Sequence, residues 1–172
     1  LPYFEAAFPG EDNPITFLNI AKAIATFERT LITPNDGLDR YLRGDETALS
    51  DDAKRGMEIV VQVGCTACHN GPMLSLGVLM PFVHGEDRGL ANVTGNDADA
   101  FQFRVATWRN VSLTAPYFHD GSAATLEDAV RVMGSVQLAR DLTDEEVHYI
   151  VAFLESLEGE MPEITIPQLP AD

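Results

Sequence analysis

The sequence predicts a mainly α-helical fold in which long loops join a few amphipathic helices. Apolar residues recur at helical spacing in four stretches, and each stretch follows a residue type that commonly caps a helix N-terminus. Between the second and third stretches, residues 70–110 are rich in glycine and show little periodicity. A loop of that length is unusual in a compact domain unless it wraps around something. The 172 residues suffice for one domain with its own core, or for one domain with extensions.

The first two predicted helices precede residue 65. The first follows a cap at Asn13 and Pro14 and ends near Thr33, because the residue before a proline disfavours the helical conformation. Residues 38–45 form a mostly polar connection with at most one helical turn. The second helix has Ser50 as its N-cap and aspartates in its first turn, where negative charge is favourable, and a glycine ends it at residue 64.

The last two predicted helices lie near the C-terminus. A sequence similar to a capping box begins at Thr125 and predicts a short helix through Met133. A full capping box at residues 143–146 predicts a longer helix, which Gly159 ends. Residues 161–172 contain three prolines and no helical period, so we expect an extended tail that packs along a surface.

The second predicted helix leads directly into Cys65-Thr66-Ala67-Cys68-His69, which has the C-x-x-C-H spacing that attaches a c-type haem. The thiols bond covalently to the haem vinyl groups, and the adjacent histidine then lies under the iron as its proximal ligand. A zinc site would need a second pair of ligands, but the sequence has no third cysteine. The sequence therefore predicts one haem c per chain, held by Cys65, Cys68 and His69. A helix that delivers such a motif resembles a class I cytochrome c domain.

The ligand on the opposite face of the iron decides the function, and five methionines are candidates. Met133 lies 64 residues after His69, which leaves enough chain to reach the distal face, and it ends the short predicted helix before Gly134. A thioether ligand raises the reduction potential and fills the coordination sphere, which favours electron transfer. Spacing alone equally allows Met133 to be a core residue. The other candidates are Met57, Met73, Met80 and Met161.

Other side chains are candidates for contacts with a haem. Arg109 could pair with a propionate through its planar guanidinium. His119 lies among aromatic residues and is either a hydrogen-bonded, partly buried histidine or a contact to a propionate or to another domain. Trp108 is expected in the core and His148 on the surface, whereas His84 has no assigned role.

The formal net charge of −16 bears on the partners of this chain. Nucleic acid is an unsuitable partner, because binding phosphates requires a basic surface. An acidic surface would steer a basic protein such as a small cytochrome, although the charge could equally serve solubility. No apolar run is long enough to span a membrane. The chain begins at Leu1 without a visible signal peptide, so we expect a processed product or a fragment, and bacterial haem attachment of this kind implies a periplasmic location.

Taken together, these features make the sequence similar to one family. The matching segments are Leu31 and residues 39–40, 44–45, 64–71, 109–111, 114–121, 125–127 and 152–154. They resemble the C-terminal half of the bacterial di-haem cytochrome c peroxidases, and the related MauG group shares much of the pattern. The resemblance runs from about Pro14 to the tail. Its most specific part is Pro116-Tyr117-Phe118-His119-Asp120-Gly121.

The resemblance implies a division of roles between two haem domains. The N-terminal domain of the family carries the peroxidatic haem, and the C-terminal domain carries a high-potential haem with His and Met ligands, which here correspond to His69 and Met133. The family also binds calcium between its domains, with backbone carbonyls at the positions of Thr114 and Pro116, and such oxygens suit a hard cation. By this comparison, residues 1–32 end the preceding domain or form an inter-domain helix, residues 33–160 form the haem domain, and residues 161–172 form the tail.

The expected function is therefore that of the electron-receiving half of a di-haem peroxidase. It would pass electrons from a small cytochrome or cupredoxin to a peroxidatic haem that reduces hydrogen peroxide to water. No catalytic residue is expected in this half, and a homodimer is compatible with the sequence. Two alternatives are a stand-alone electron carrier with a single haem and the corresponding half of a MauG-like oxidase, in which a tyrosine at another position would be the distal ligand.

Overall fold

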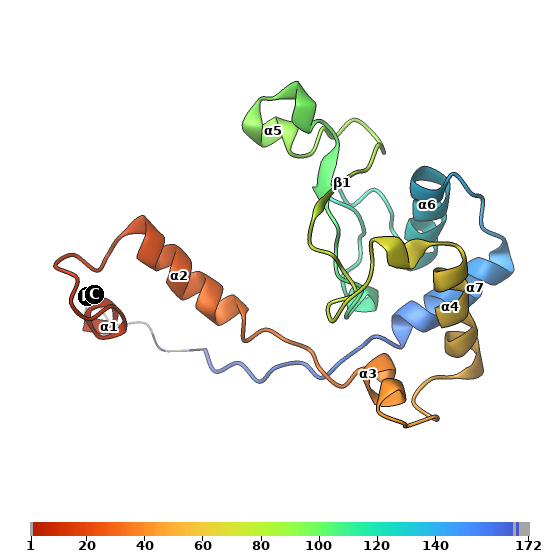
Figure 1. Ribbon diagram of the computed structural model, residues 1–172, viewed down its shortest axis with the longest axis horizontal. Helices are drawn as coiled ribbons and strands as arrows, with labels where there is room; N and C mark the ends of the chain where they lie inside the picture. The colour runs from red at the N-terminus through yellow and green to blue at the C-terminus, as the bar shows by residue number, and fades with distance from the viewer. Residues whose placement is uncertain (1, 167, 169–172) are drawn as a thin grey trace. The chain divides into compact units, whose positions relative to one another are not determined.

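The computed structural model describes residues 2–166 and 168, and it is mainly helical, with one small sheet (Figure 1). Its contacts divide the chain into two units, of which one comprises residues 34–160 and the other the segments before and after them. The elements in chain order are α1 (Pro2–Ala7), α2 (Phe17–Glu28), α3 (Gly37–Leu42), α4 (Asp51–Gln62), η1 (Cys65–Ala67), β1 (Leu79–Pro81), α5 (Ala91–Thr94), η2 (Asp97–Asp99), β2 (Gln102–Arg104), η3 (Val111–Leu113), α6 (Leu126–Leu138) and α7 (Asp144–Glu155).

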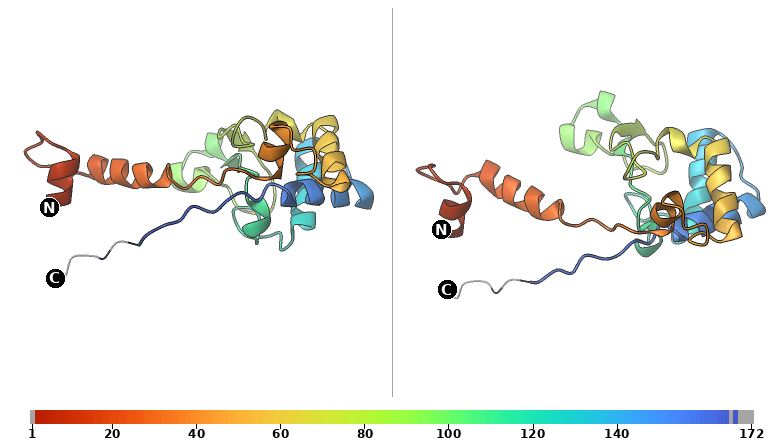
Figure 2. Two further views of the ribbon diagram at one scale, coloured as in Figure 1. Left: turned by 90° about the horizontal axis from the view of Figure 1, so that it is seen from below. Right: turned by 60° about the horizontal axis from the view of Figure 1, so that its bottom comes forward.

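The core of the larger unit lies between α4, α6 and α7, which pack together in the views of Figures 1 and 2. Helix α4 buries Ile59 and Val60 against α7. The two backbones approach most closely at Gly56, where a Cβ atom would lie 1.9 Å from the carbonyl oxygen of Tyr149. Only glycine fits there, so the sequence at this position fixes how closely the two helices pack.

Two predicted helix starts are confirmed at the level of single hydrogen bonds. The side chain of Ser50 accepts a 3.1 Å hydrogen bond from the backbone N–H of Ala53. Thr143 and Glu146 form the reciprocal capping box at the start of α7. Both signals are local, because the cap and its partner lie within three residues of each other.

The N-terminal predictions need three corrections. Helix α2 begins at Phe17 with Thr16 as its N-cap, and it ends at Glu28, not near Thr33. Asn13 is not the cap, because the Thr16 hydroxyl accepts the 3.1 Å hydrogen bond from the backbone N–H of Asn19. Helix α1 is present where no helix was predicted, and α3 spans residues 37–42, where a connection with at most one helical turn was expected.

Helix α6 is longer than predicted and continues through Met133 to Leu138. The helix therefore does not end at Met133, and Gly134 does not follow its end. It is buried inside the helix, where an added Cβ would lie 2.9 Å from side-chain atoms of Leu142. The glycine is required by this close contact with the following segment, and Ala139, which has a left-handed φ of 48°, is the C-cap that follows Leu138.

The long segment of residues 70–110 is a loop containing short regular elements. Strands β1 and β2 pair antiparallel within it, with Met80 opposite Phe103, and α5 and η2 lie between them. This small sheet brings the residues just after the C-x-x-C-H motif next to those that precede Trp108, so it positions both ends of the loop.

The smaller unit contains α1 and α2. Helix α2 exposes large apolar side chains along its length, among them Phe17, Leu18 and Phe27. Residues 161–166 adopt neither helix nor strand, and residues 167 and 169–172 of the predicted tail lie outside the described residues. Within the described part of the chain, no helix combines the length and the hydropathy needed to cross a membrane.

Candidate functional site

The C-x-x-C-H motif forms a tight turn directly after α4. Gly64 makes the turn possible with a left-handed φ of 99°, and Cys65 begins the short helix η1. The backbone N–H of His69 donates a 3.1 Å hydrogen bond to the carbonyl of Cys65, so the motif closes on itself. Both cysteines are free and half-buried, and burial raises the pKa of the Cys65 thiol. The turn thus presents two thiols and an imidazole from five consecutive residues.

The imidazole of His69 is held on two sides. Its Nδ1 atom lies 3.1 Å from the carbonyl oxygen of Ala106, and a carbonyl can only accept a hydrogen bond. Nδ1 therefore carries the proton, and the lone pair lies on Nε2. The ring also stacks on the indole of Trp108 with centroids 4.5 Å apart and planes 14° apart. Burial lowers the pKa of His69, and the backbone groups of Leu74 and Ala106 partly offset this shift. The lowered pKa favours the neutral form of the ring, which is the form that binds a metal.

The surroundings of the motif fit a haem c. The chain folds back directly after it, since the backbone N–H of Leu76 donates a 3.0 Å hydrogen bond to the carbonyl of Cys68. This returning segment exposes large apolar side chains, and such side chains gain stability when an apolar macrocycle covers them. A neutral imidazole with a free Nε2 lone pair and two free thiols complete the donor set that a covalent haem requires. The exposed side chains are those of Met73, Leu76, Val78 and Leu79.

Met133 is half-buried on α6, and the C-terminal turn of that helix lies beside the motif. A Cβ atom added at Gly64 would lie 4.0 Å from the side chain of Leu138, and the Gln137 side-chain amide donates a 2.8 Å hydrogen bond to the carbonyl of Pro81. Since residues four apart share a helix face, Met133 lies on the same face as Gln137, one turn earlier. The helix therefore brings Met133 to the side of α6 that faces the segment after the motif, and the role of this residue as a ligand stays a prediction.

Arg109 lies in an ion-pair cluster that sequence reasoning missed. Its guanidinium donates hydrogen bonds of 2.6 Å to the carboxylate of Asp36 and 3.0 Å to that of Asp39, and its Nε–H donates to the carbonyl of Pro72 at 2.7 Å. Asp36 is fully buried. These partners explain the position of Arg109 without a haem propionate, and the propionate contact stays a prediction.

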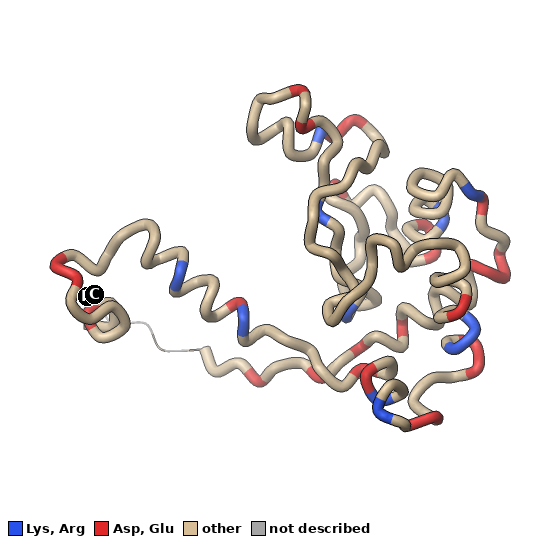
Figure 3. The backbone as a smooth tube through the Cα atoms, viewed as in Figure 1, with Lys and Arg blue, Asp and Glu red and all other residues tan. Residues whose placement is uncertain are grey.

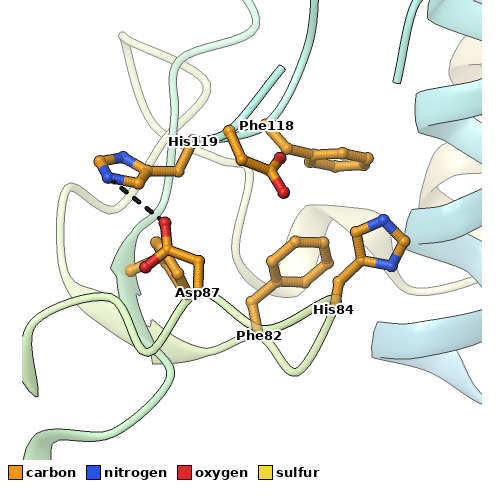
Figure 4. Close-up of a pocket in the computed structure, with 7 residues that line it drawn as sticks. Phe82, His84, Asp87, Phe118 and His119 are labelled. Carbon is orange, nitrogen blue, oxygen red and sulfur yellow. Dashed lines mark ion pairs between the residues drawn. The ribbon is translucent and has the colours of Figure 1, made fainter. Parts of the chain in front are cut away.

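His119 lies on one side of a small aromatic cluster, shown in Figure 4. Its Nε2 atom lies 3.6 Å from a carboxylate oxygen of Asp87, and its side chain is 70% exposed. On the other side of this cluster, His84 lies against the rings of Phe82 and Phe118. His119 is thus not buried, and its contact to a propionate or to another domain stays a prediction.

Thr114 and Pro116, the residues expected to offer carbonyls to calcium, are both exposed, and the peptide bond between Ala115 and Pro116 is cis. In residues 2–166 and 168, no group of three or more His, Cys, Asp or Glu side chains is arranged to hold a metal ion. A cation at Thr114 and Pro116 would therefore depend on backbone oxygens, and its presence stays a prediction.

Comparisons with known proteins point to one family. A family profile described as "Di-haem cytochrome c peroxidase" matches residues 2–47. The chain is 43% identical over 98% of its length to the cytochrome c551 peroxidase of Pseudomonas aeruginosa, and 44% identical over 97% to that of Nitrosomonas europaea. It covers 51% and 52% of these two proteins, so it spans about half the length of the curated relatives it matches.

The MauG group is also similar. The methylamine utilization protein MauG of Methylorubrum extorquens is 31% identical over 98% of this chain. A solved structure of a MauG-like protein associated with microbial copper homeostasis matches with a TM-score of 0.71 at 28% identity, and the match covers 92% of this chain and 58% of that one. This likeness agrees with the mainly helical, cytochrome c-like fold.

Proposed function

Because this chain belongs to the family of di-haem cytochrome c peroxidases and MauG proteins, we propose that it is the electron-receiving half of such a peroxidase. In this proposal it accepts electrons from a small donor protein and passes them to a peroxidatic haem in the other half, where hydrogen peroxide is reduced to water. The observation that carries the proposal is the single C-x-x-C-H turn, in which His69 is held as the Nδ1–H tautomer by the carbonyl of Ala106.

Each residue of the site has a defined role in this proposal. Cys65 and Cys68 form the thioether bonds, and His69 offers its Nε2 lone pair to the iron. A haem c held in this way supplies one-electron transfer at its iron. Met133 would supply the second ligand from α6, and a bound thioether would leave no position open for peroxide. The low polarity of the exposed side chains after the motif keeps water from the site once they are covered.

The donor is proposed from two observations. The relatives from Pseudomonas and Nitrosomonas are named cytochrome c551 peroxidases, which makes a small cytochrome c the first candidate for a donor. The net charge of −16 favours a donor with a basic docking face. Acidic residues occur along the loops and helices of residues 34–160 (Figure 3), although none lies between Glu58 and Glu86, so the attraction comes from segments outside the motif. A cupredoxin with a basic face would meet the same requirement.

A second candidate is the corresponding half of a MauG-like oxidase, and the 31% identity to MauG favours it. In that case, a tyrosine elsewhere would be the distal ligand, and Met133 would be a half-buried core residue. The near-infrared spectrum separates these two, because only a methionine ligand gives a sulfur-to-iron charge-transfer band. A stand-alone electron carrier is the third candidate, and an upstream C-x-x-C-H in the same gene would exclude it.

The family further suggests a periplasmic location, a possible homodimer and a calcium ion at the carbonyls of Thr114 and Pro116. All three belong to the proposal and not to the described structure. Calorimetry with calcium tests the last, with tight binding expected only when the other half of the protein is present, since the remaining ligands would come from there.

The deciding experiment compares this chain with the two-domain protein. Intact mass under denaturing conditions should show one haem per chain, retained through acid–organic extraction. In peroxide-dependent oxidation of reduced cytochrome c, the isolated chain should exchange electrons with the donor but show little turnover, whereas the two-domain protein should turn over. Full turnover by the isolated chain would mean that the roles of the two haems have been assigned wrongly.

A further inference from the structure

The tryptophan beside the motif is not needed to complete the donor set, yet it makes the closest ring contact with His69. The indole of Trp108 lies 4.5 Å from the imidazole, centroid to centroid, and the planes differ by 14°. Trp108 comes two residues after Ala106, whose carbonyl holds Nδ1. The same short segment, between β2 and η3, therefore supplies both the hydrogen-bond acceptor and the stacking surface.

The two contacts restrict different motions of the imidazole. A hydrogen bond at Nδ1 fixes one edge of the ring, but it leaves the ring free to tilt about the line from Nδ1 to the carbonyl oxygen. A face-to-face contact with a wider ring opposes that tilt, because tilting separates the two π surfaces. His69 is thereby fixed in both position and plane before any ligand binds.

Trp108 is itself held by the core. Its indole meets the ring of Phe153 edge-on, with centroids 6.3 Å apart and planes 86° apart. Phe153 is 2% exposed and belongs to α7, which packs against α4, the helix that delivers the motif. Trp108 therefore connects the ring of His69 to the buried core between α4 and α7.

We infer that Trp108 is a positioning residue that sets the plane of the His69 imidazole relative to the haem. This inference rests on the proposed function, because it assumes that His69 binds iron through Nε2. For an axial imidazole, the angle of the ring plane about the iron–nitrogen bond decides which iron d orbital overlaps with the ring π system. A fixed plane gives one electronic ground state and one potential, whereas a mobile plane gives a distribution of both.

The test uses the haem-loaded chain and two substitutions of the indole. Trp108→Leu keeps an apolar side chain but removes the stacking face, and Trp108→Phe keeps a smaller face. Electron paramagnetic resonance of the ferric protein should show a broadened low-spin signal with shifted g values in Trp108→Leu, and a signal closer to wild type in Trp108→Phe. The midpoint potential should shift in the same order.

A matched control separates positioning from packing. Tyr149, like Trp108, is a half-buried aromatic residue that packs against the core, but it belongs to α7. Its ring contacts His148 and not His69. Tyr149→Leu should lower the urea midpoint of unfolding and leave the g values unchanged. Identical g values and potential in wild type and both Trp108 variants would overturn this inference alone. A wild-type chain that carries no covalent haem would instead overturn the proposed function.

Discussion

The carboxylate of Asp36, which is fully buried, accepts a 2.6 Å hydrogen bond from the guanidinium of Arg109. The same guanidinium binds Asp39 and the carbonyl of Pro72, so one side chain joins α3 to the segment after the C-x-x-C-H motif. Asp36 is also the N-cap of α3 and accepts a hydrogen bond from the backbone N–H of Asp39. The cluster therefore ties the start of the larger unit to the loop beside the candidate haem site.

We expect Asp36→Asn to destabilise the haem-loaded chain by about 3 kcal/mol, the lower end of what breaking a buried ion pair costs. Asparagine still caps a helix, so the loss reports mainly on the missing charge next to Arg109. Asp39 keeps a part of the pairing, which limits the effect. Urea unfolding measures the difference, with Glu58→Gln as the control.

Glu58 forms an exposed ion pair with Arg55 within α4, and removing its charge should cost at most about 1 kcal/mol. Similar losses in Asp36→Asn and Glu58→Gln would show that the buried cluster does not hold the larger unit together.

The capping box of α7 should make stability depend on pH in the acid range. The backbone N–H of Thr143 donates a 2.9 Å hydrogen bond to the carboxylate of Glu146. This hydrogen bond is the main reason why the pKa of the Glu146 carboxyl is lowered. A lowered folded-state pKa means that the unfolded chain takes up the proton first as pH falls. The stability that ionised Glu146 contributes is therefore complete above the ordinary glutamate pKa and is lost below it.

Glu146→Gln keeps an acceptor for the Thr143 N–H but loses the charge and its ion pair with Arg140, so it should be less stable than wild type at neutral pH by at most about 1 kcal/mol, and the difference should shrink as pH falls below about 4. Unfolding midpoints measured from pH 7 to pH 3 give this comparison. Glu145→Gln removes the same charge from the same helical turn without touching the capping box. An equally pH-dependent loss in Glu145→Gln would assign the effect to the general charge of the turn.

The parts of the fold that sequence reasoning predicted correctly are those determined by neighbouring residues. Ser50, Thr143 and Glu146 interact with groups within three positions, so their pattern alone predicts two helix starts. Asn13 was wrong as a cap because Thr16 lies closer to the apolar run and satisfies the backbone first. Such a competition between two good caps is decided by geometry that the sequence does not display.

Contacts between distant residues account for what was missed at the site. Arg109 lies 73 positions from Asp36 in the sequence, and nothing in the sequence around either residue indicates that they form an ion pair. Gly134 was expected directly after the end of a helix, where glycine is common, whereas it lies inside α6 against Leu142 of the following segment. Trp108 was expected in the core, and only the folded chain shows that one of its faces meets His69.

Replacing Met133 tests the proposed second ligand of the iron. Met133→Leu keeps the volume of the side chain and removes the sulfur. If the thioether binds iron, the near-infrared sulfur-to-iron band should disappear, and the midpoint potential should fall by on the order of 0.1 V, within the range that axial ligands cover. Met80→Leu is the control, because Met80 in β1 also follows the motif. Loss of the band in Met80→Leu, with the band kept in Met133→Leu, would transfer the role to Met80.

The charge of the chain makes a separate prediction about the donor. With 27 acidic and 11 basic residues, the chain attracts a donor that has a basic face. Dissolved salt screens this attraction and shortens its range. The second-order rate of electron transfer from a reduced basic cytochrome c to the haem-loaded chain, followed by stopped-flow absorbance, should fall about tenfold as salt rises from about 10 mM to about 500 mM. The same measurement with a small uncharged reductant should change little, because no steering acts on it. A rate for the basic cytochrome that is independent of salt would mean that the acidic surface serves solubility, and the donor would then be recognised by apolar contacts alone.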